Sequence, residues 1–295
     1  MILTLWIVYT ASFFLMHLKP GGPFDGEKKQ SPEIRKNLEA KYHFDWPLWK
    51  QYGYHLGKAC RLDFGQSLKQ KDKYVNDIIR EGFPISATLG VCGLSLAVLL
   101  GISAGVVSAL QRQTLLDFSF RTLATLGIAV PNFVLAGFAI IIFVFVLDWI
   151  PAAGWGKPIN LILPSLCLSA PFAAYISRLT RTGLLEVLNQ DYIRTAYAKG
   201  LMTPAVVFRH ALRGALLPVV SFLGPATAGI LTGSLVLERI FFIPGMGTHF
   251  IEAVLQNDHF VSLAIVMVYT VLLFTMNTLV DLSYGLIDPR VKLQD

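Results

Sequence analysis

The chain has 295 residues, of which 54% are hydrophobic and 15% are charged. Because an average soluble domain carries about 25% charged residues, this composition excludes an ordinary soluble protein and favours a lipid environment. The net charge of +6 requires no nucleic-acid partner, since basic loops that face an anionic membrane leaflet account for it.

Apolar residues gather into runs long enough to cross a hydrocarbon core, which needs roughly 20 helical residues. Six such runs lie near residues 2–18, 85–109, 122–147, 159–177, 215–237 and 261–285. They predict an all-α polytopic membrane protein with six transmembrane helices. The first run is short and begins without basic residues. Two alternatives to a complete first transmembrane helix are therefore a start of the natural chain further upstream and a cleaved signal peptide.

The polar segment after the first run predicts short helices. Residues 20–23, Pro-Gly-Gly-Pro, cannot continue a helix and should end the first span. A helix is expected over residues 31–42, capped by Ser31, and a second over 47–62. The Asp-Phe-Gly sequence at 63–65 predicts a turn.

Several prolines fall within the apolar runs. Each leaves a backbone carbonyl that a neighbour must satisfy, so they predict either kinks in a packed bundle or helices that shift. The prolines concerned are Pro131, Pro164, Pro171, Pro218 and Pro225.

Lysine and arginine concentrate in the loops after the second and fourth runs and in the C-terminal tail. These residues are Arg112, Arg121, Arg178, Arg181, Arg194, Lys199, Arg209, Arg213, Arg290 and Lys292. The opposing short loops hold only Lys157 and Arg239. Basic short loops stay in the cytoplasm, so both termini are expected there. The basic residues of segment 19–83 do not alter this orientation, because long segments cross the membrane largely regardless of charge.

The sequence contains no recognisable energy source or hydrolytic centre. It has no G-x-x-x-x-G-K-[ST] phosphate loop, no H-E-x-x-H and no G-x-S-x-G. Its cysteines, Cys60, Cys92 and Cys167, form no metal-binding pattern. Asp281 is the clearest ionisable residue in a span, whereas an ion-coupled carrier would need several. We therefore expect no enzyme activity, no cofactor and no metal.

The longest cytoplasmic stretch, residues 183–216, predicts a helix, a turn and a second helix. Gly200 supplies a left-handed residue to close the first helix. Thr203 is expected to cap the second helix, with Pro204 in its first position. Its basic and apolar surface suits either a protein partner or a helical hairpin that lies on anionic lipid.

Two segments of this stretch resemble the loop of ABC importer permeases whose consensus is E-A-A-x-x-x-G, in the version found in peptide and nickel permeases. They are Arg194-Thr-Ala-Tyr-Ala-Lys-Gly200 and Arg209-His-Ala-Leu-Arg213. The consensus is matched at Ala196 and Gly200, while Arg194 and Thr195 replace its first two residues. In that family the loop forms a coupling helix that docks on the ATP-binding subunit. The resemblance implies docking contacts at Arg194, Thr195, Ala196, Tyr197, Ala198, Lys199, Gly200, Thr203, Pro204, Arg209, His210 and Arg213.

Other segments resemble the B-subunit permeases of oligopeptide ABC importers. They are Pro20–Phe24, Gly26-Glu27, Glu39–His43, Asp63–Gly65 with Ser67, and Asp288–Arg290. The run from Glu238 to Gly247 is similar to the family's external P-G-x-G loop. It implies an extracytoplasmic mouth at Glu238, Pro244, Gly245 and Gly247, although this sequence alone favours a tight turn there.

The resemblance implies a type I ABC importer permease that carries oligopeptides across the bacterial inner membrane. Its expected partners are a second homologous permease, ATP-binding subunits, an extracytoplasmic peptide-binding protein and membrane lipid. The expected divisions are a first transmembrane helix (1–19), an extracytoplasmic helical region (20–83), a permease core (84–285) with the coupling loop 183–216, and a cytoplasmic tail (286–295). A dipeptide, nickel or glutathione substrate and a self-contained channel or carrier are the alternatives.

Overall fold

A computed structural model describes residues 1–295 apart from 20–23, 25–31, 71, 152 and 288–295. The side chains of residues 32, 232, 233, 280, 281 and 283–287 also lie outside the description. The expected turn at 20–23, the Ser31 cap, the side chain of Asp281 and the resemblance at 288–290 therefore fall outside the described part of the chain.

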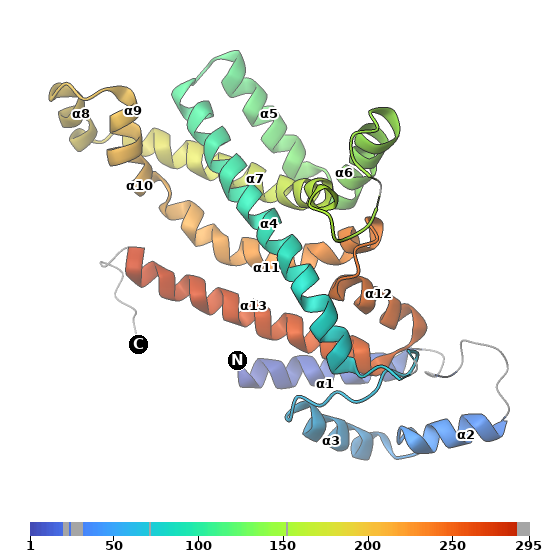
Figure 1. The fold of residues 1–295 in the computed structure, drawn as a ribbon. Coiled ribbons are helices and arrows are strands. Elements are labelled where there is room, and N and C mark those ends of the chain that lie inside the picture. The colour runs from blue at the N-terminus through green and yellow to red at the C-terminus, as the bar shows by residue number, and fades with distance from the viewer. Residues whose placement is uncertain (20–23, 25–31, 71, 152, 288–295) are drawn as a thin grey trace. The chain divides into compact units, whose positions relative to one another are not determined.

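The described chain is helical throughout (Figure 1). Its helices are α1 (Ile2–Leu18), α2 (Pro32–Lys41), α3 (Leu48–Ala59), α4 (Val75–Leu110), α5 (Leu115–Ala129), α6 (Asn132–Ala139), the π-helix η1 (Ile140–Val146), α7 (Ile159–Leu188), α8 (Asp191–Ala198), α9 (Thr203–Ala205), the π-helix η2 (Val206–Ala211), α10 (Leu212–Ala215), α11 (Leu217–Ile240), α12 (Met246–Gln256) and α13 (His259–Ile287). The described residues contain one isolated antiparallel bridge, between Gln66 and Tyr74.

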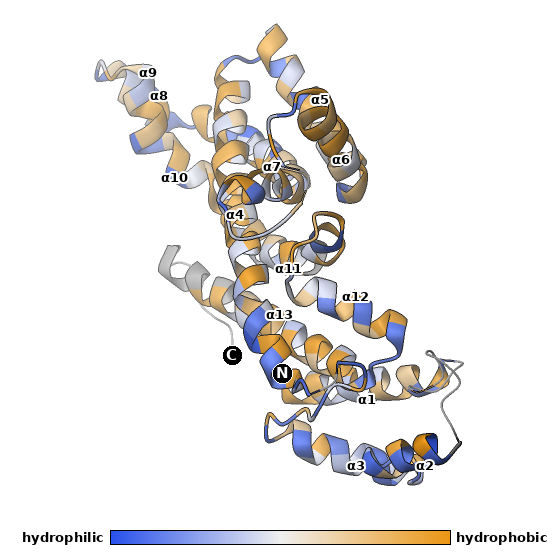
Figure 2. Cartoon of the chain, turned by 45° about the vertical axis from the view of Figure 1, so that its right-hand side comes forward, coloured by the Kyte–Doolittle hydropathy of each residue, from blue (hydrophilic) through white to orange (hydrophobic). Residues whose placement is uncertain are grey.

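Each expected apolar run coincides with a helix or a bent pair of helices. Within the described residues, α4, α7 and residues 259–279 are each long and apolar enough to span a membrane, and two bent helix pairs raise the number of candidate spans to five. α1 is a shorter apolar helix of 17 residues. Figure 2 shows hydrophobic residues dominating α5 and α6, whereas hydrophilic residues line α2 and α3. The expected all-α polytopic membrane fold is confirmed.

The third run, 122–147, is not one continuous helix as expected. α5 ends at Ala129 and α6 begins at Asn132, with an angle of 111° between the two parts of the pair. Val130 has an extended backbone (φ −91°, ψ 124°) because a residue before proline disfavours the helical region, and Pro131 has no N–H to continue the helix. Pro164, Pro171 and Pro225, by contrast, lie inside helices.

The chain divides into two compact units. The first comprises Met1–Ser86 and Pro244–Leu272. In it, Tyr9 and Phe13 of α1 pack with Leu263 of α13, and a second core joins the start of α4 to α12 and α13. Ser67 Oγ donates a hydrogen bond to Asp258 Oδ2, which also accepts from Leu68 N at 3.1 Å. This buried carboxylate ties the segment before α4 to the start of α13.

The expected short helices of this unit are confirmed as α2 and α3. The turn at 63–65 is confirmed as well, since Gly65 N donates to Asp63 Oδ1 at 2.9 Å and Gly65 has a φ of +77°. The hydrogen bond from Gly65 N is the largest influence that lowers the pKa of the Asp63 carboxyl below its usual range. The Lys58 ammonium adds to this effect, with its Nζ 3.3 Å from Asp63 Oδ2.

The second unit comprises Ala87–Ile243 and residues 273–295 as far as they are described. Its centre is α7, which packs against α4, α5 and α11. Gly101 and Gly105, spaced as in a G-x-x-x-G pattern, let α4 approach α7 closely: a Cβ at Gly105 would lie 2.6 Å from the Ser177 carbonyl oxygen. α7 then leads directly into the loop for which the sequence predicts a docking role.

Candidate functional site

The loop begins with α8, an amphipathic helix of two turns. Gln190 precedes it in an extended conformation (φ −76°, ψ 150°), and Asp191 places a negative charge in its first turn. Ile193 and Ala196, three residues apart, are 0% and 6% exposed and form its inner face. The remaining α8 residues face outward. One side of this helix therefore packs against the rest of the second unit, and the other side is exposed for contact with a partner.

Gly200 ends α8 as the sequence predicts. Its φ is +79°, in the left-handed region that favours glycine. Gly200 N donates to Tyr197 O at 2.9 Å and Leu201 N donates to Ala196 O at 3.3 Å, which together form a Schellman motif. Lys199 occupies the C-cap position, close to the negative end of the helix dipole.

The second helix differs from expectation at its start and in its middle. Helix geometry begins at Thr203 itself, after Met202, and no side chain caps it, so the expected cap by the Thr203 hydroxyl is not formed. Pro204 lies within the first turn, where its missing N–H has no cost. Residues 206–211 form a π-helix. This geometry is rare in proteins, and where it occurs it often lies at a functional site.

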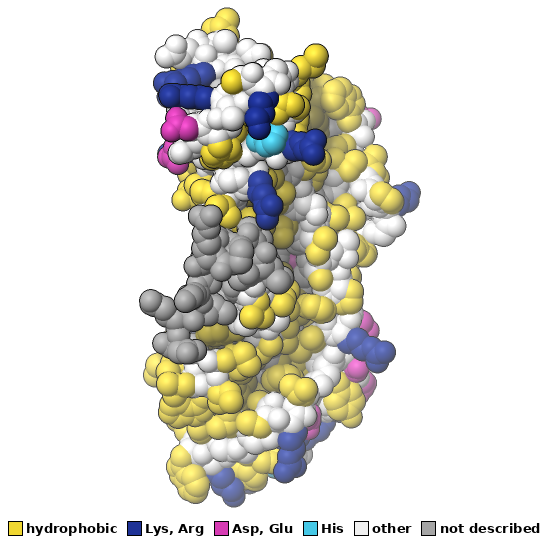
Figure 3. Space-filling view, turned by 90° about the vertical axis from the view of Figure 1, so that its left-hand side faces the viewer, with side chains coloured by type: hydrophobic (Ala, Val, Ile, Leu, Met, Phe, Trp, Pro, Cys, Tyr) yellow, Lys and Arg dark blue, Asp and Glu magenta, His cyan; other side chains and the backbone are white. Residues whose placement is uncertain are grey.

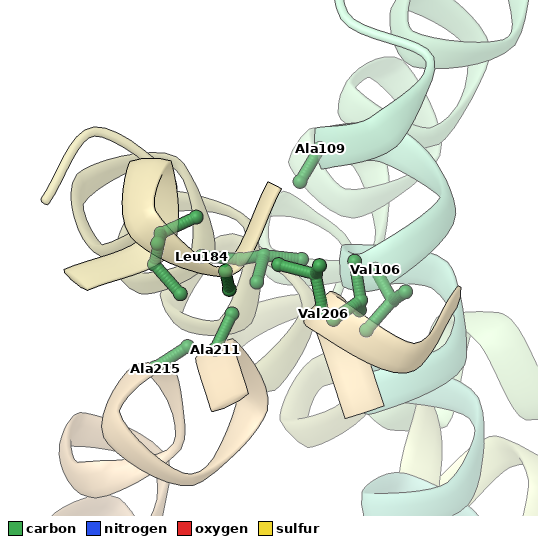
Figure 4. Close-up of a cluster of buried hydrophobic side chains, with 9 residues drawn as sticks. Val106, Ala109, Leu184, Val206, Ala211 and Ala215 are labelled. Carbon is green, nitrogen blue, oxygen red and sulfur yellow. The ribbon is translucent and has the colours of Figure 1, made fainter. Parts of the chain in front are cut away.

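A buried apolar cluster holds the two helices together and joins them to the spans (Figure 4). It draws residues from α4, α7, α8, η2 and α10, namely Val106, Ala109, Leu184, Ile193, Ala196, Val206, Val207, Ala211 and Ala215. Burying a side chain of this size contributes about 1.5–3 kcal/mol for Val or Leu, so the loop is a packed element. Ala196, which the sequence places among the docking residues, points into this cluster.

The outer face of the loop is basic and apolar. Figure 3 shows arginine, lysine and histidine side chains gathered at the end of the second unit that carries α8 to α10. Arg194, Lys199, Arg209 and Arg213 are exposed, and His210 is half-buried. Met202 is 79% exposed and Phe208 is 68% exposed. We call the following residues the loop surface: Arg194, Thr195, Tyr197, Ala198, Lys199, Gly200, Met202, Thr203, Pro204, Phe208, Arg209, His210 and Arg213.

A polar cluster that the sequence analysis missed lies beside this loop. Asp117, at the start of α5, is 2% exposed and accepts hydrogen bonds from Arg181 of α7 and Ser108 of α4. Two sequence signals could have revealed it. Asp117 is the only acidic residue between Glu81 and Asp148, and Thr114-x-x-Asp117 matches a capping pattern. Thr114 is indeed the N-cap of α5 and accepts from Asp117 N at 3.4 Å.

The expected mouth residues fall in both units. In the second unit, Glu238 is 0% exposed near the end of α11, and its carbonyl oxygen accepts from Ile243 N at 2.8 Å. In the first unit, Gly245 is the N-cap of α12, and Gly247 lies in its first turn. The simple turn between spans that the sequence alone favours is therefore wrong, because the P-G-x-G segment opens a helix.

The start of α12 packs tightly within the first unit. Met246 N donates to Ser86 Oγ at 2.9 Å, and a Cβ at Gly82 would lie 3.0 Å from Met246 N. Burial lowers the pKa of His249, on the second turn of α12, below its usual range. Pro244 is exposed, whereas Gly245 and Gly247 are buried.

The described residues contain no group of three histidine, cysteine or carboxylate side chains arranged to hold a metal ion. What the loop surface offers is a firmly held, partly apolar and partly basic face. Such a face is suited to contact with another protein.

A comparison with protein families decides the class of the chain. Residues 97–293 match the model of the binding-protein-dependent transport system inner membrane component. The chain belongs to this family. This permease is thus a component of a transport system in the inner membrane, and its family is one of transport subunits rather than of enzymes.

Curated relatives match the permease over almost its full length. It is 47% identical over 290 residues to the dipeptide transport system permease protein DppB of Bacillus subtilis (strain 168), covering 98% of this chain and 94% of the relative. It is 44% identical over 291 residues to the oligopeptide transport system permease protein OppB of Escherichia coli (strain K12), covering 98% and 95%. The resemblance to peptide permeases is confirmed.

Solved structures share the fold of the permease. A chain of the MetNI methionine ABC transporter in an inward-facing conformation matches with a TM-score of 0.60 and 15% identity, covering 72% of this chain and 96% of that chain. A chain of an amino acid ABC transporter with histidines matches with a TM-score of 0.55, also at 15% identity, covering 70% and 93%. The expected ABC importer permease architecture is confirmed.

Proposed function

We propose that this chain is one of two homologous permease subunits of a bacterial ABC importer that carries oligopeptides across the cytoplasmic membrane. The observation that carries the proposal is the 43–47% identity to oligopeptide and dipeptide transport permeases over 98% of the chain. ATP is bound and hydrolysed by separate subunits, and an extracytoplasmic binding protein delivers the peptide.

The loop surface is the proposed docking site for the ATP-binding subunit. Protein interfaces have a buried apolar centre within a polar rim and are enriched in aromatic residues, methionine and arginine. Met202, Phe208 and Tyr197 supply the apolar part, with exposed fractions of 79%, 68% and 42%. Arg209 and Arg213 supply the rim. The rival interpretation, a hairpin lying on anionic lipid, would place the two arginines against phosphate groups and the apolar side chains at the acyl boundary.

The proposed orientation follows from the basic residues. Arg112 and the arginines of the loop surface belong to short connections, which retain basic residues in the cytoplasm. Arg121 lies in the second turn of α5, close to the connection that holds Arg112. Both termini are then cytoplasmic. Residues 20–83 form an extracytoplasmic region, and Glu238 and Pro244–Gly247 belong to the mouth that faces the binding protein.

Transport in reconstituted vesicles tests this function. We expect uptake of a labelled tetrapeptide only when both permeases, the ATP-binding subunits, the binding protein and ATP are all present. A catalytically inactive ATP-binding subunit is the control. Uptake by this chain alone, without ATP, would reject the proposal in favour of a channel or carrier.

Cross-linking tests the docking site. Single cysteines placed at the exposed positions 194, 195 and 197–204, in a chain without its natural cysteines, should cross-link to the ATP-binding subunit, whereas a cysteine in place of the exposed Trp49 of α3 should not. Cross-links from position 49 and none from 194–204 would contradict the assignment.

A dipeptide substrate is the second candidate, because the relative of Bacillus subtilis at 47% identity is named a dipeptide permease. Uptake measured for di-, tri-, tetra- and pentapeptides with the cognate binding protein separates the two. Saturable uptake confined to dipeptides would select the second candidate.

A further inference from the structure

Asp117 is held by donors from three directions. Arg181 Nε donates to its Oδ1 at 2.8 Å, and Arg181 Nη2 donates to its Oδ2 at 3.0 Å. Ser108 Oγ donates to Oδ1 at 2.6 Å, and Gln113 N donates to Oδ2 at 3.1 Å. The paired arginine contacts fix both distance and orientation, which a single contact would not do.

The cluster joins three helices at one level of the second unit. Ser108 lies in the last turn of α4, Asp117 in the first turn of α5, and Arg181 in the last third of α7. Gln113 belongs to the turn between α4 and α5. Any displacement of α7 at Arg181 is therefore imposed on the start of α5.

The same helices also carry the core of the docking loop. On α4, Val106 and Ala109 enter the buried apolar cluster while Ser108, between them, is 1% exposed and faces Asp117. On α7, Leu184 enters the cluster three residues after Arg181. The apolar cluster and the polar cluster thus lie next to each other on α4 and α7. The apolar cluster contacts α8, and the polar cluster contacts α5.

A buried ion pair of this kind behaves as a stiff link. Asp117 is 2% exposed and Arg181 is 21% exposed on their side chains. Removing one partner of a buried pair leaves the other charge without compensation, so the pair resists separation. An apolar contact at the same place would allow the helices to slide, because dispersion contacts have little directionality.

We infer that Asp117 and Arg181 are positioning residues that transmit movement of the docking loop to α5. The inference rests on the proposed function, in which an ATP-binding subunit moves α8. α5 ends at the sharp bend before α6, so its displacement at Asp117 is carried along a rigid helix of 15 residues to that bend. Binding of the ATP-binding subunit and coupling of its cycle to the spans are therefore two separate events. Only the second event depends on the contact between Asp117 and Arg181.

The coupling ratio of the complete transporter tests this inference. Purified complexes in vesicles are compared for peptide taken up per ATP hydrolysed and for the amount of ATP-binding subunit retained on purification. In Asp117→Asn and in Arg181→Gln we expect the coupling ratio to fall at least about tenfold, the ordinary scale of a coupling energy between sites. Retention of the ATP-binding subunit should stay within about twofold.

Conservative and matched variants distinguish transmission from simple stability. Arg181→Lys keeps the charge but loses the paired geometry, so we expect an intermediate coupling ratio. Arg121→Gln removes an exposed charge from the same helix, α5, and should leave the coupling ratio within about twofold of the unmodified complex. A purely structural pair would lower yield and thermal stability while complexes that form keep the normal ratio.

Several outcomes would overturn the inference. They are a normal coupling ratio in Asp117→Asn and Arg181→Gln, or a parallel loss of coupling and of ATP-binding subunit. If Asp117→Asn does not assemble, Arg181→Lys and Ser108→Ala carry the test, and normal ratios in both would overturn it. Failure of the proposed function is distinct, because the unmodified complex would then show no ATP-dependent uptake.

Discussion

Gly183 of α7 lies against Ala215 of α10 so closely that a Cβ built on the glycine would meet the Ala215 carbonyl oxygen at 2.5 Å. The contact closes the base of the loop formed by α8 to α10, where the chain leaves one span and enters the next. Because the obstacle is backbone, no side-chain rotation relieves it. This position therefore controls how the loop is seated on the second unit.

Gly183→Ala should separate α7 from α10 and loosen the loop. Inserting a methyl group into a packed contact costs typically about 1–3 kcal/mol. We expect a lower apparent melting temperature and weaker retention of the ATP-binding subunit. Gly137→Ala on α6, where a Cβ meets no atom within 4 Å, is the matched control and should be neutral or slightly stabilising. Equal melting temperatures for the two variants would contradict the close-contact argument.

Gly200→Val should distort the turn that ends α8. A non-glycine residue in the left-handed region costs about 1–2 kcal/mol, and more for a β-branched one. Relief of this strain would tilt the second helix, so uptake should fall while the ATP-binding subunit loses affinity. Gly200→Asn is the control, since asparagine tolerates the left-handed conformation. The turn would be irrelevant to docking if valine and asparagine gave the same uptake.

Met202→Glu should weaken docking without affecting the fold. Met202 is 79% exposed, so its substitution removes no internal packing. Central apolar residues of an interface contribute about 2 kcal/mol or more, which corresponds to roughly a 30-fold loss of affinity. Affinity is measured by titrating the ATP-binding subunit onto the permeases in lipid nanodiscs. Trp49→Glu, at a side chain 75% exposed on α3, is the control for a new surface charge. Equal affinities would remove Met202 from the interface.

The stability of the first unit should depend on pH through His55. Burial, followed by the charges of His43, Lys58 and His17, lowers the pKa of His55 from 6.5 to about 4. The unfolded chain therefore binds this proton at a higher pH than the folded chain does. The contribution of neutral His55 to stability is complete above pH 6.5 and is lost as the pH falls through 6.5 toward about 4. The melting temperature of His55→Gln should change less than that of the unmodified chain across this window, and parallel curves would contradict the assignment.

The spans and the helical shape of the loop from α8 to α10 are predictable from the sequence because their signals are local. Long apolar runs define α4, α7 and α13, and Gly200 marks the end of α8 because only a few residues accept its backbone conformation. The expected cap by Thr203 is wrong for a reason that is also local. The helix starts at Thr203 itself, so the N-cap position falls on Met202, whose side chain makes no capping hydrogen bond. Boundaries of this kind shift easily by one residue.

The sequence by itself determined that this chain is a multi-span helical membrane protein with a basic loop shaped as two helices, because hydropathy, charge and turn chemistry act over a few residues. Only the tertiary structure decided which face of that loop is held and what it is tied to. Asp117 and Arg181 are 64 residues apart in sequence, and Gly183 meets a backbone atom of α10. Local signals can mark Asp117 as unusual, but nothing local in the sequence identifies the partner in either contact. Such contacts depend on how helices cross, and crossing is set by the packing of surfaces assembled from distant segments.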